Sequence, residues 1–347
     1  MKDILKKIFK SGDAFGCDIG TSSLKFVQLK ENNGILMLES LGMLDADILS
    51  PNSVGIQRAR AYLKEHGMAG KQVNANIEDS TLRIRRMDLP EMPDGDMKIA
   101  IRWNFREYVD GPIEKYSVDY SAFGDIKVNG DKRPILAYAV SNDSVAKLSE
   151  LIKQTGLKPV SIEPNATALL AIFDHNVGWK KGEFYVMIDI GSKVSNFIAM
   201  GGGCLLFSRP LTTFGMDGLI KQIVKDVSCP PDKAGAYVSA LLKNALPAEI
   251  QEKVSVCVQG FLGAMAVEIQ RSVDAFCMMF HVEKVEAIYL SGGGSMISGI
   301  TDSFTKNLGI TTRLFNPFEK IDMRAAGGVV PNAQLYAVAA GLAMPKG

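Results

Sequence analysis

Residues Ala14 to Leu29 carry the sequence AFGCDIGTSSLKFVQL, in which apolar residues lead into Asp18. A glycine and three hydroxyl residues follow the aspartate, and an alternating apolar run then resumes. This pattern predicts a β-strand, a tight turn and a second strand. Taken alone, the turn has two interpretations: a β-hairpin with a Ser/Thr turn, or an anion site.

The chemistry of this turn suits a phosphate group. Glycine lets the backbone approach a ligand closely, and successive N–H groups and hydroxyls donate to phosphate oxygens. Asp18, at the end of the strand, can hold water on Mg²⁺, a cation that favours carboxylate and phosphate oxygens. A lysine on the same face adds a point charge. The candidate phosphate contacts are Gly20, Thr21, Ser22, Ser23 and Lys25.

A second copy of the pattern favours the anion site. Phe184 to Ile198 carry FYVMIDIGSKVSNFI, so that Asp189 corresponds to Asp18 and Gly191 to Gly20. The copy lies roughly half a chain length further on, which predicts two similar lobes with one such turn each. One turn from each lobe would then hold a single nucleotide in a cleft.

Composition narrows the class of protein. A chain of 347 residues predicts two or more domains. The net charge of +1 argues against nucleic-acid binding by the whole chain. No apolar run is long enough for a transmembrane helix, and no secretory signal is present. Five scattered cysteines fit reduced thiols in the cytoplasm. Residues 1–12 form a basic amphipathic leader, which is either frayed or in contact with an anionic membrane surface.

Three further segments stand out. Residues 80–160 look like an inserted subdomain, with a helix at 95–108 that carries Ile99, Ile101, Trp103 and Tyr108. A helix at 254–280 places Glu268, Arg271 and Ser272 on one polar face, for which spacing alone favours a solvated surface. A predicted buried strand at 287–291 runs into Gly292, Gly293, Gly294 and Ser295, where a flat ring or a phosphate can lie against bare backbone.

The two aspartate turns and the glycine segment, in this order, resemble the phosphate and adenosine loops of the actin/Hsp70/sugar-kinase superfamily. The match narrows over residues 14–344 to the type IV pilus assembly protein PilM family, which is related to FtsA. The segments that carry it are DIGTSSLKFVQL, LRIRRMDLPEM, AIRWNFREYVDGPIEKYSVDY, GLKPVSIEPNATALL, LSGGGSMISGI, NPFEKI and YAVAAGLAM. The fold class that this implies is α/β: an actin-like, ribonuclease H-like two-lobed ATPase fold with an FtsA-like 1C subdomain.

The resemblance also implies a division of the chain. After the leader, the first lobe (1A) would comprise 13–79 with 161–180, and subdomain 1C would comprise 80–160. The second lobe would comprise 181–220 with 286–347 (2A) and 221–285 (2B).

The cofactors implied are ATP and Mg²⁺, with Asp18 and Asp189 holding the metal through water. By resemblance the nucleotide contacts of the second half are Gly191, Ser192, Lys193, Ser195, Asn196, Glu268, Arg271, Ser272, Gly292, Gly293, Gly294 and Ser295. Glu268 would contact ribose, and Arg271, Ser272 and Gly293–Ser295 would frame adenine. Glu163, at a strand end, is the candidate for orienting water if hydrolysis occurs.

By resemblance, the protein would act as a scaffold in type IV pilus assembly, with weak or no ATP hydrolysis. The implied partner is the N-terminal cytoplasmic peptide of a PilN-like inner-membrane protein, lying between the first lobe and the insert, where an exposed strand edge suits an extended peptide. The protein would be cytoplasmic and peripheral at the inner membrane, mainly through partners. Self-association stays open.

Two alternatives belong to other functional classes. A small-molecule, sugar-type kinase needs a general base facing the substrate hydroxyl, and Asp119 and Asp143 are candidates by residue type alone. An FtsA-like division protein is the second alternative. That family usually ends in a basic amphipathic membrane helix, which residues 341–347 do not resemble.

Overall fold

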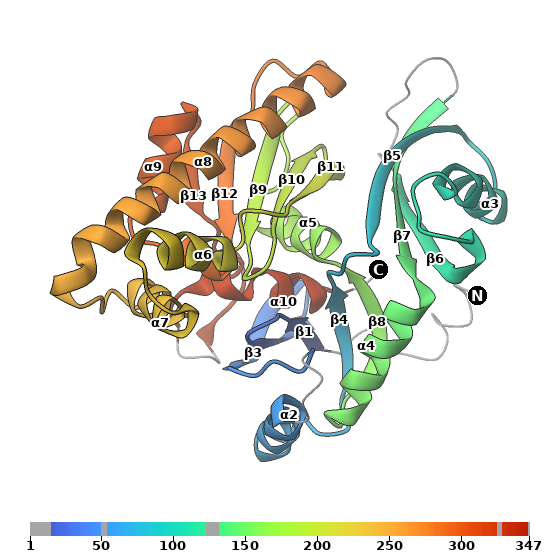
Figure 1. Ribbon diagram of the computed structural model, residues 1–347. Helices are drawn as coiled ribbons and strands as arrows, with labels where there is room; N and C mark the ends of the chain where they lie inside the picture. Colours follow the sequence, from blue (N-terminus) through green and yellow to red (C-terminus); the bar gives the residue numbers. More distant parts are fainter. Residues whose placement is uncertain (1–14, 50–53, 123–131, 325–327, 346–347) are drawn as a thin grey trace. The chain divides into compact units, whose positions relative to one another are not determined.

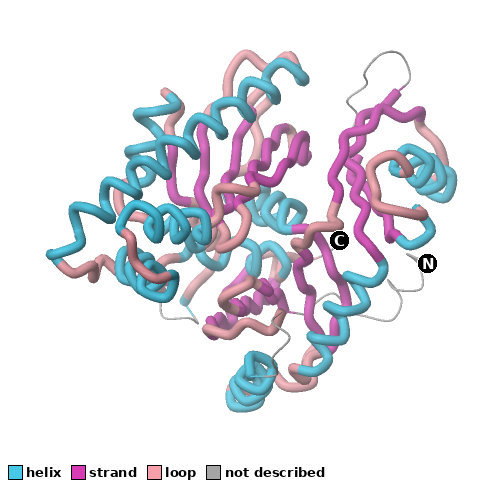
Figure 2. The backbone as a smooth tube through the Cα atoms, in the orientation of Figure 1, coloured by secondary structure: helices cyan, strands magenta, loops and turns pink. Residues whose placement is uncertain are grey.

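The computed structural model describes residues 15–49, 54–122, 132–324 and 328–345 (Figure 1). The predicted leader 1–12 therefore lies outside the described residues. The chain divides into two compact units, each with mixed strands and helices (Figure 2). Unit 1 comprises Met1–Gly178, Gly203–Leu206 and Pro317–Gly347, and unit 2 comprises Trp179–Gly202 and Phe207–Asn316.

The main sheet of unit 1 has the strand order β3-β2-β1-β4-β8. Strands β1 (Phe15–Ile19), β2 (Leu24–Asn32) and β3 (Ile35–Leu44) form an antiparallel meander. Asn33 and Gly34 join β2 to β3 with φ of 51° and 78°, the left-handed region that such a hairpin turn requires. On the other side, β4 (Gln72–Ile77) and β8 (Lys158–Pro164) run parallel to β1, so three strands end at the same edge.

Helices α2 (Val54–Glu65), α5 (Asn165–Asn176) and α10 (Ala337–Leu342) also belong to unit 1. Helix α10 is rich in small residues and follows a 3₁₀ turn at Ala333–Tyr336. Its small residues allow close packing: a Cβ on Gly16 of β1 would lie 2.0 Å from the Ala339 oxygen. Residues 317–347 therefore group with unit 1, whereas the sequence-based division placed them in the second lobe.

The inserted segment forms its own sheet, β5-β7-β6, from β5 (Arg83–Pro90), β6 (Tyr116–Ala122) and β7 (Lys132–Ser141). Helix α3 (Asp94–Phe105) packs on this sheet through Met97, Ile101 and Phe105. Of the apolar residues on which the sequence analysis based this helix, Ile101 alone is buried, while Ile99, Trp103 and Tyr108 are exposed. Ile99, Ile101 and Trp103 recur at every second position, and this spacing does not indicate which face of the helix is buried.

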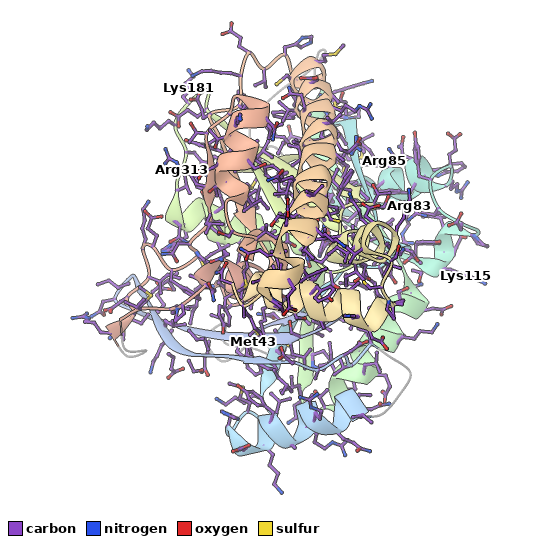
Figure 3. The ribbon with its side chains drawn as sticks, turned by 60° about the vertical axis from the view of Figure 1, so that its left-hand side comes forward. Met43, Arg83, Arg85, Lys115, Lys181 and Arg313 are labelled. Atoms are coloured by element: carbon purple, nitrogen blue, oxygen red, sulfur yellow. The ribbon has the colours of Figure 1, made fainter. Side chains whose placement is uncertain are left out.

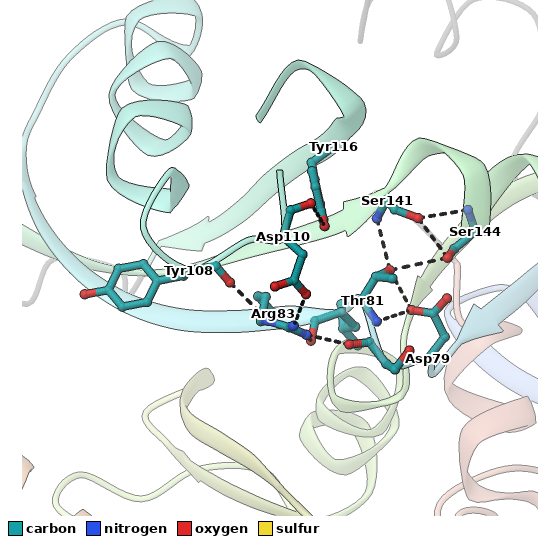
Figure 4. A network of polar contacts seen from close by, with 10 residues as sticks. Asp79, Thr81, Arg83, Tyr108, Asp110, Tyr116, Ser141 and Ser144 are labelled. Carbon is teal, nitrogen blue, oxygen red and sulfur yellow. Dashed lines mark hydrogen bonds and ion pairs between the residues drawn. The ribbon is translucent and has the colours of Figure 1, made fainter. Parts of the chain in front are cut away.

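A hydrogen-bonded network connects the segment that follows β4 to the end of β7 and the start of the next helix (Figure 4). Thr81 donates its backbone N–H to Asp79 Oδ1 at 2.8 Å, and its hydroxyl donates to the same oxygen at 2.7 Å. Ser141 caps α4 (Asn142–Gln154), because its hydroxyl accepts the Ser144 N–H at 3.0 Å. The residue pattern of the sequence predicts Asn142 as the cap, which is wrong by one position, because Asn142 is the first residue of the helix.

Unit 2 repeats the plan with the strand order β11-β10-β9-β12-β13. The strands of this sheet are β9 (Phe184–Ile190), β10 (Ser195–Gly201), β11 (Cys204–Leu211), β12 (Ala287–Ser291) and β13 (Thr312–Leu314). Residues Cys204–Leu206 of β11 are grouped with unit 1, and the rest of the sheet belongs to unit 2. Its helices are α6 (Met216–Val227), α7 (Pro231–Leu242), α8 (Ala248–Phe280) and α9 (Ile300–Leu308). Phe276 of α8 packs edge-on against Phe184 of β9. Among the described helices, none combines the length and the apolar character needed to cross a membrane.

Candidate phosphate-binding loops

The first loop is a tight turn at the carboxyl end of β1. Asp18 and Ile19 end the strand, and the Gly20 N–H donates to the Ser23 oxygen at 3.0 Å, closing the turn. Ser22 is exposed and Thr21 is partly exposed, whereas Ser23 is buried. The predicted strand–turn–strand is confirmed, and it leaves two of the three hydroxyl residues accessible to a ligand.

Both carboxylate oxygens of Asp18 have partners from neighbouring strands. Lys25 lies opposite Asp18 in the β1–β2 register and donates its ammonium to Oδ2 at 2.9 Å. Asn76 of β4 donates its amide to Oδ1 at 3.0 Å. Because the side chains of Asp18 and Lys25 are each only 11% exposed, this is a shielded ion pair. Lys25 thus lies beside the loop as predicted, and its ammonium contacts the carboxylate.

Asn76 was missed by the sequence analysis. Its amide oxygen accepts the Ile19 N–H at 2.6 Å, and its amide nitrogen also reaches Asn165 Oδ1 at 2.9 Å. One buried amide therefore ties the end of β1 to the start of α5. The available signal was an asparagine within the apolar segment VNANI, since buried polar groups need partners.

Three parallel strands of unit 1 bring polar side chains to one edge of the sheet. Asp18 lies near the end of β1, Asn76 near the end of β4, and Glu163 of β8 lies in register with Asn76. Glu163 accepts the Thr167 hydroxyl at 3.1 Å. Open α/β sheets bind ligands at the carboxyl ends of their strands, so this edge is the expected place for a site.

The second loop has the same construction. Asp189 is buried near the carboxyl end of β9, and the Gly191 N–H donates to the Val194 oxygen at 3.2 Å. Asn196 lies opposite Asp189 in the β9–β10 register, the place that Lys25 takes in the first loop. Ser291 of β12 donates to Asp189 Oδ1 at 3.0 Å, as Asn76 donates to Asp18. The sequence repeat is therefore a structural repeat that extends to the polar contacts of each aspartate.

The remaining residues of the second loop differ in their availability to a ligand. Ser195 is fully buried and donates its hydroxyl to the Phe214 oxygen at 2.6 Å. Ser192 donates to Asp217 Oδ1 at 3.0 Å, and the Asp217 N–H donates back to the Ser192 oxygen, which fastens the loop to the start of α6. Lys193 is exposed. Ser195 is thus a structural contact, whereas Lys193 remains accessible.

The glycine segment after β12 is packed at two positions and open at a third. Gly292 has φ of 79°, and a Cβ there would lie 2.7 Å from Asp189 Oδ1. A Cβ on Gly294 would lie 2.1 Å from Ile190 Cγ2, whereas a Cβ on Gly293 would meet nothing within 4 Å. The Ser295 hydroxyl turns back to the Gly292 oxygen at 2.6 Å. Gly293 therefore presents bare, open backbone next to the second loop.

The three residues expected on one polar face of α8 differ in their burial and in their partners. Glu268 pairs with Arg209 of β11 and with Arg271, whose Nη1 lies 3.3 Å from Glu268 Oε2. Ser272 is fully buried and donates to the Glu268 backbone oxygen at 2.8 Å, so the expectation of a shared polar face is wrong for Ser272. Arg209 was missed, because nothing in the sequence links β11 to α8.

The residues considered for a kinase base lie outside these loops. Asp119 is on β6 of the insert, with a largely exposed carboxylate 4.0 Å from Lys98. Asp143 is exposed in the first turn of α4. Cys17, next to Asp18, is not a nucleophile, because burial and the neighbouring carboxylate raise the pKa of its thiol.

The comparisons with known proteins agree with this geometry. The family model of the type IV pilus assembly protein PilM matches residues 16–346. The chain resembles the solved "PilM-PilN type IV pilus biogenesis complex" at 22% identity and a TM-score of 0.80, over 96% of this chain and 98% of that one.

A more remote likeness supports the fold alone. The ethanolamine utilization protein EutJ from Carboxydothermus hydrogenoformans is 12% identical, with a TM-score of 0.54, over 99% of this chain and 95% of that one. The fold is the actin-like ATPase fold, with two lobes built on sheets. Because the family model spans nearly the whole sequence, the chain belongs to the type IV pilus assembly protein PilM family.

Proposed function

We propose that this protein is an actin-like nucleotide-binding scaffold of type IV pilus assembly, with weak or no ATP hydrolysis. The observation that carries the proposal is the repeated loop, in which each unit places a buried aspartate and a glycine turn at the carboxyl end of its central strand. The actin-like ATPase fold implies nucleotide binding. Two such loops in one chain suit the phosphates of ATP.

The residues at the loops fit a magnesium nucleotide. Buried carboxylates and phosphate oxygens are the ligands that Mg²⁺ prefers, and Mg²⁺ usually keeps several waters. Asp18 and Asp189 would hold the ion through water, and the backbone N–H groups at 20–23 and 191–195 would donate to phosphate oxygens. When bound, Mg²⁺ would neutralise part of the negative charge of the phosphates. Glu163, which accepts the Thr167 hydroxyl, would orient water if hydrolysis occurs.

Glu268, Arg271 and Gly293 form the proposed nucleoside contacts of unit 2. Arg209 and Arg271 both hold Glu268, so its carboxylate is fixed for a hydroxyl donor such as ribose. The open backbone at Gly293 suits a flat base, because no side chain stands in front of it.

The proposed partner is the N-terminal cytoplasmic tail of a PilN-like inner-membrane protein. The support is the likeness of this chain to the solved "PilM-PilN type IV pilus biogenesis complex". In unit 1, β5 and β8 are both terminal strands of their sheets. An extended peptide adds to such an edge by main-chain hydrogen bonds. The protein would then reach the inner membrane from the cytoplasm through this tail.

The nucleotide part is tested by thermal unfolding of the full chain with and without ATP and MgCl₂. Ligand at about 100 times its Kd adds about 2.7 kcal/mol to the free energy of unfolding, so the melting temperature should rise by several degrees. The double variant Asp18→Ala/Asp189→Ala should lose this rise, whereas Asp45→Ala, an exposed carboxylate in unit 1, should keep it. No rise in the native chain at saturating nucleotide would overturn the proposal.

The partner part is tested with a fluorescent synthetic peptide of the PilN-like tail. Arg85 is exposed on β5 (Figure 3), and its guanidinium lies over the Tyr108 ring at 4.7 Å. Arg85→Glu should weaken peptide binding if the tail pairs with this edge, and the matched reversal Lys64→Glu on α2 should not. Equal affinity in both variants would rule out β5 as the docking edge.

A further inference from the structure

Helix α3 has a second apolar face that its own unit does not cover. Its inner face packs on the β5-β7-β6 sheet, but Ile99 and Trp103 on the outer face are 58% and 62% exposed. Tryptophan is enriched at interfaces, because it buries a large area when it is covered.

The exposed residues form a regular row along the helix. Asp96, Ile99, Trp103 and Arg106 follow one another at intervals of three, four and three residues, which places them on one side of the helix. The Arg106 guanidinium lies over the Trp103 ring, 3.6 Å from its centroid. The row therefore has an apolar centre, an acidic residue at one end and a basic residue at the other. Three-four spacing is the pattern of helices that pair side by side.

This row is complementary to itself. If two copies of α3 lie antiparallel about a two-fold axis at Ile101, Ile99 of each copy meets Trp103 of the other, and Asp96 of each copy meets Arg106 of the other. The arrangement gives a central apolar contact closed by two ion pairs. An interface of this kind is isologous, since the same surface serves both subunits.

We propose that the α3 row is a self-association surface, and that its occupant is the same row of a second copy of this chain. Charge separates this occupant from a lipid surface. Asp96 within the row would face an anionic membrane unfavourably, whereas a second copy supplies Arg106 as its counter-ion. The contact is small, so it forms a weak dimer that becomes important where many copies are held close together.

Charge reversal gives a direct test by sedimentation velocity of the full chain over a concentration series. The native chain should show a concentration-dependent dimer. Asp96→Arg alone brings two guanidinium groups together at each end of the interface, and Arg106→Asp alone brings two carboxylates together there. Each single variant should therefore associate at least about tenfold more weakly, since every like-charge contact occurs twice in the dimer.

Mixing the two variants is the decisive measurement. In a heterodimer of the Asp96→Arg chain with the Arg106→Asp chain, each end joins a guanidinium group to a carboxylate, so mixing the two variants should restore association. The double variant Asp96→Arg/Arg106→Asp exchanges the two charges within one chain. Both end contacts of its own dimer again join opposite charges, so this double variant should recover the association that each single variant loses. Only an antiparallel pairing of these two positions predicts this recovery.

Apolar substitutions complete the design. Trp103→Ala should weaken the dimer at least about tenfold, because aromatic anchors dominate small interfaces. Val256→Ala on α8, at a position that is 65% exposed in unit 2, is the matched control and should leave the dimer unchanged. Unchanged melting temperatures would show that the variants are folded. A chain that stays monomeric at every concentration, or a dimer indifferent to Trp103→Ala and to charge reversal, would overturn the proposal.

Discussion

At the residue scale, Asp18 is held by the side-chain amide of Asn76, a contact that no motif in the sequence indicates. Asn76 is 3% exposed and bonds to Ile19, Asp18 and Asn165 at once. Removing it leaves buried donors and acceptors without partners, and each such group costs about 1 to 3 kcal/mol. We expect Asn76→Ala to lower the free energy of unfolding by roughly 2 to 4 kcal/mol in urea denaturation.

A matched asparagine controls this prediction. Asn104 also has a bonded amide, at 2.8 Å from the Ala100 oxygen, but it is exposed on α3. Water replaces that bond, so Asn104→Ala should change the free energy of unfolding by about 0.5 kcal/mol or less. A similar loss in both variants would mean that burial of the Asn76 amide is not the cause.

A second prediction at this scale concerns Asp79 and pH. Burial raises the pKa of its carboxyl, but hydrogen bonds from Ser144 and Thr81 outweigh burial and bring the pKa below the ordinary 3.8. A carboxylate with a lowered folded pKa stabilises the fold above the ordinary value, and this contribution disappears as the pH falls through the folded pKa. Asp79→Asn should therefore reduce stability at neutral pH, by an amount that shrinks below pH 3.8.

Urea midpoints of both proteins, measured across this range, test the sign. The native chain should lose its advantage over Asp79→Asn on acidification. An advantage that grows as the pH falls would mean that the hydrogen bonds of Asp79 favour its protonated form.

At the scale of elements, the glycine segment after β12 offers two neighbouring residues with opposite roles. The methyl group of Gly294→Ala would lie 2.1 Å from Ile190 Cγ2 and 2.8 Å from Met216 Sδ. We expect that overpacking to lower the free energy of unfolding by about 1 to 3 kcal/mol. Gly293→Ala faces open space and should fold normally, yet its methyl group should reduce the thermal shift produced by ATP.

This pair separates packing from ligand contact. Thermal unfolding without nucleotide reports packing, and the shift on adding ATP and MgCl₂ reports binding. If Gly293→Ala keeps the full ATP shift, the nucleotide does not lie against this backbone. If it destabilises the protein as much as Gly294→Ala, the segment is packed more tightly than its geometry indicates.

At the scale of the whole molecule, the last described helix closes unit 1. A Cβ on Gly341 of α10 would lie 1.9 Å from the Ala168 oxygen of α5, and α10 also packs on β1 through Gly16. We expect Gly341→Ala to lower stability by about 1 to 3 kcal/mol, because the backbone oxygen of α5 cannot move without disturbing its helix. Amide hydrogen exchange should show lost protection in β1 and α5, with β9 and β12 unchanged.

The helical glycine at 263 is the control, with the opposite expected sign. Nothing lies within 4 Å of a Cβ there, and the residue is in the middle of α8. Gly263→Ala should raise the free energy of unfolding by about 0.5 to 1 kcal/mol, because alanine loses less backbone entropy in a helix. Destabilisation by both substitutions would point to glycine itself rather than to the α10 contact.

Much of the architecture could be predicted from local pattern. Alternation of apolar residues predicts the bounds of β1 and β3, and turn residues predict the turn at Asn33 and Gly34. The internal repeat predicts the two Asp-x-Gly loops. The direct nucleotide contacts proposed from the family resemblance stay predictions, with Ser195, Ser272 and Ser295 now bonded to backbone oxygens.

The sequence by itself determined the elements and the two aspartate loops, because periodicity and turn residues act over a few positions. The tertiary structure determined which residues hold those loops: Asn76 lies 58 positions from Asp18, and Arg209 lies 59 positions from Glu268. It also determined that Trp103 faces outward and that residues 317–347 join unit 1. Such contacts depend on strand order and helix placement, which bring together residues that no local pattern connects.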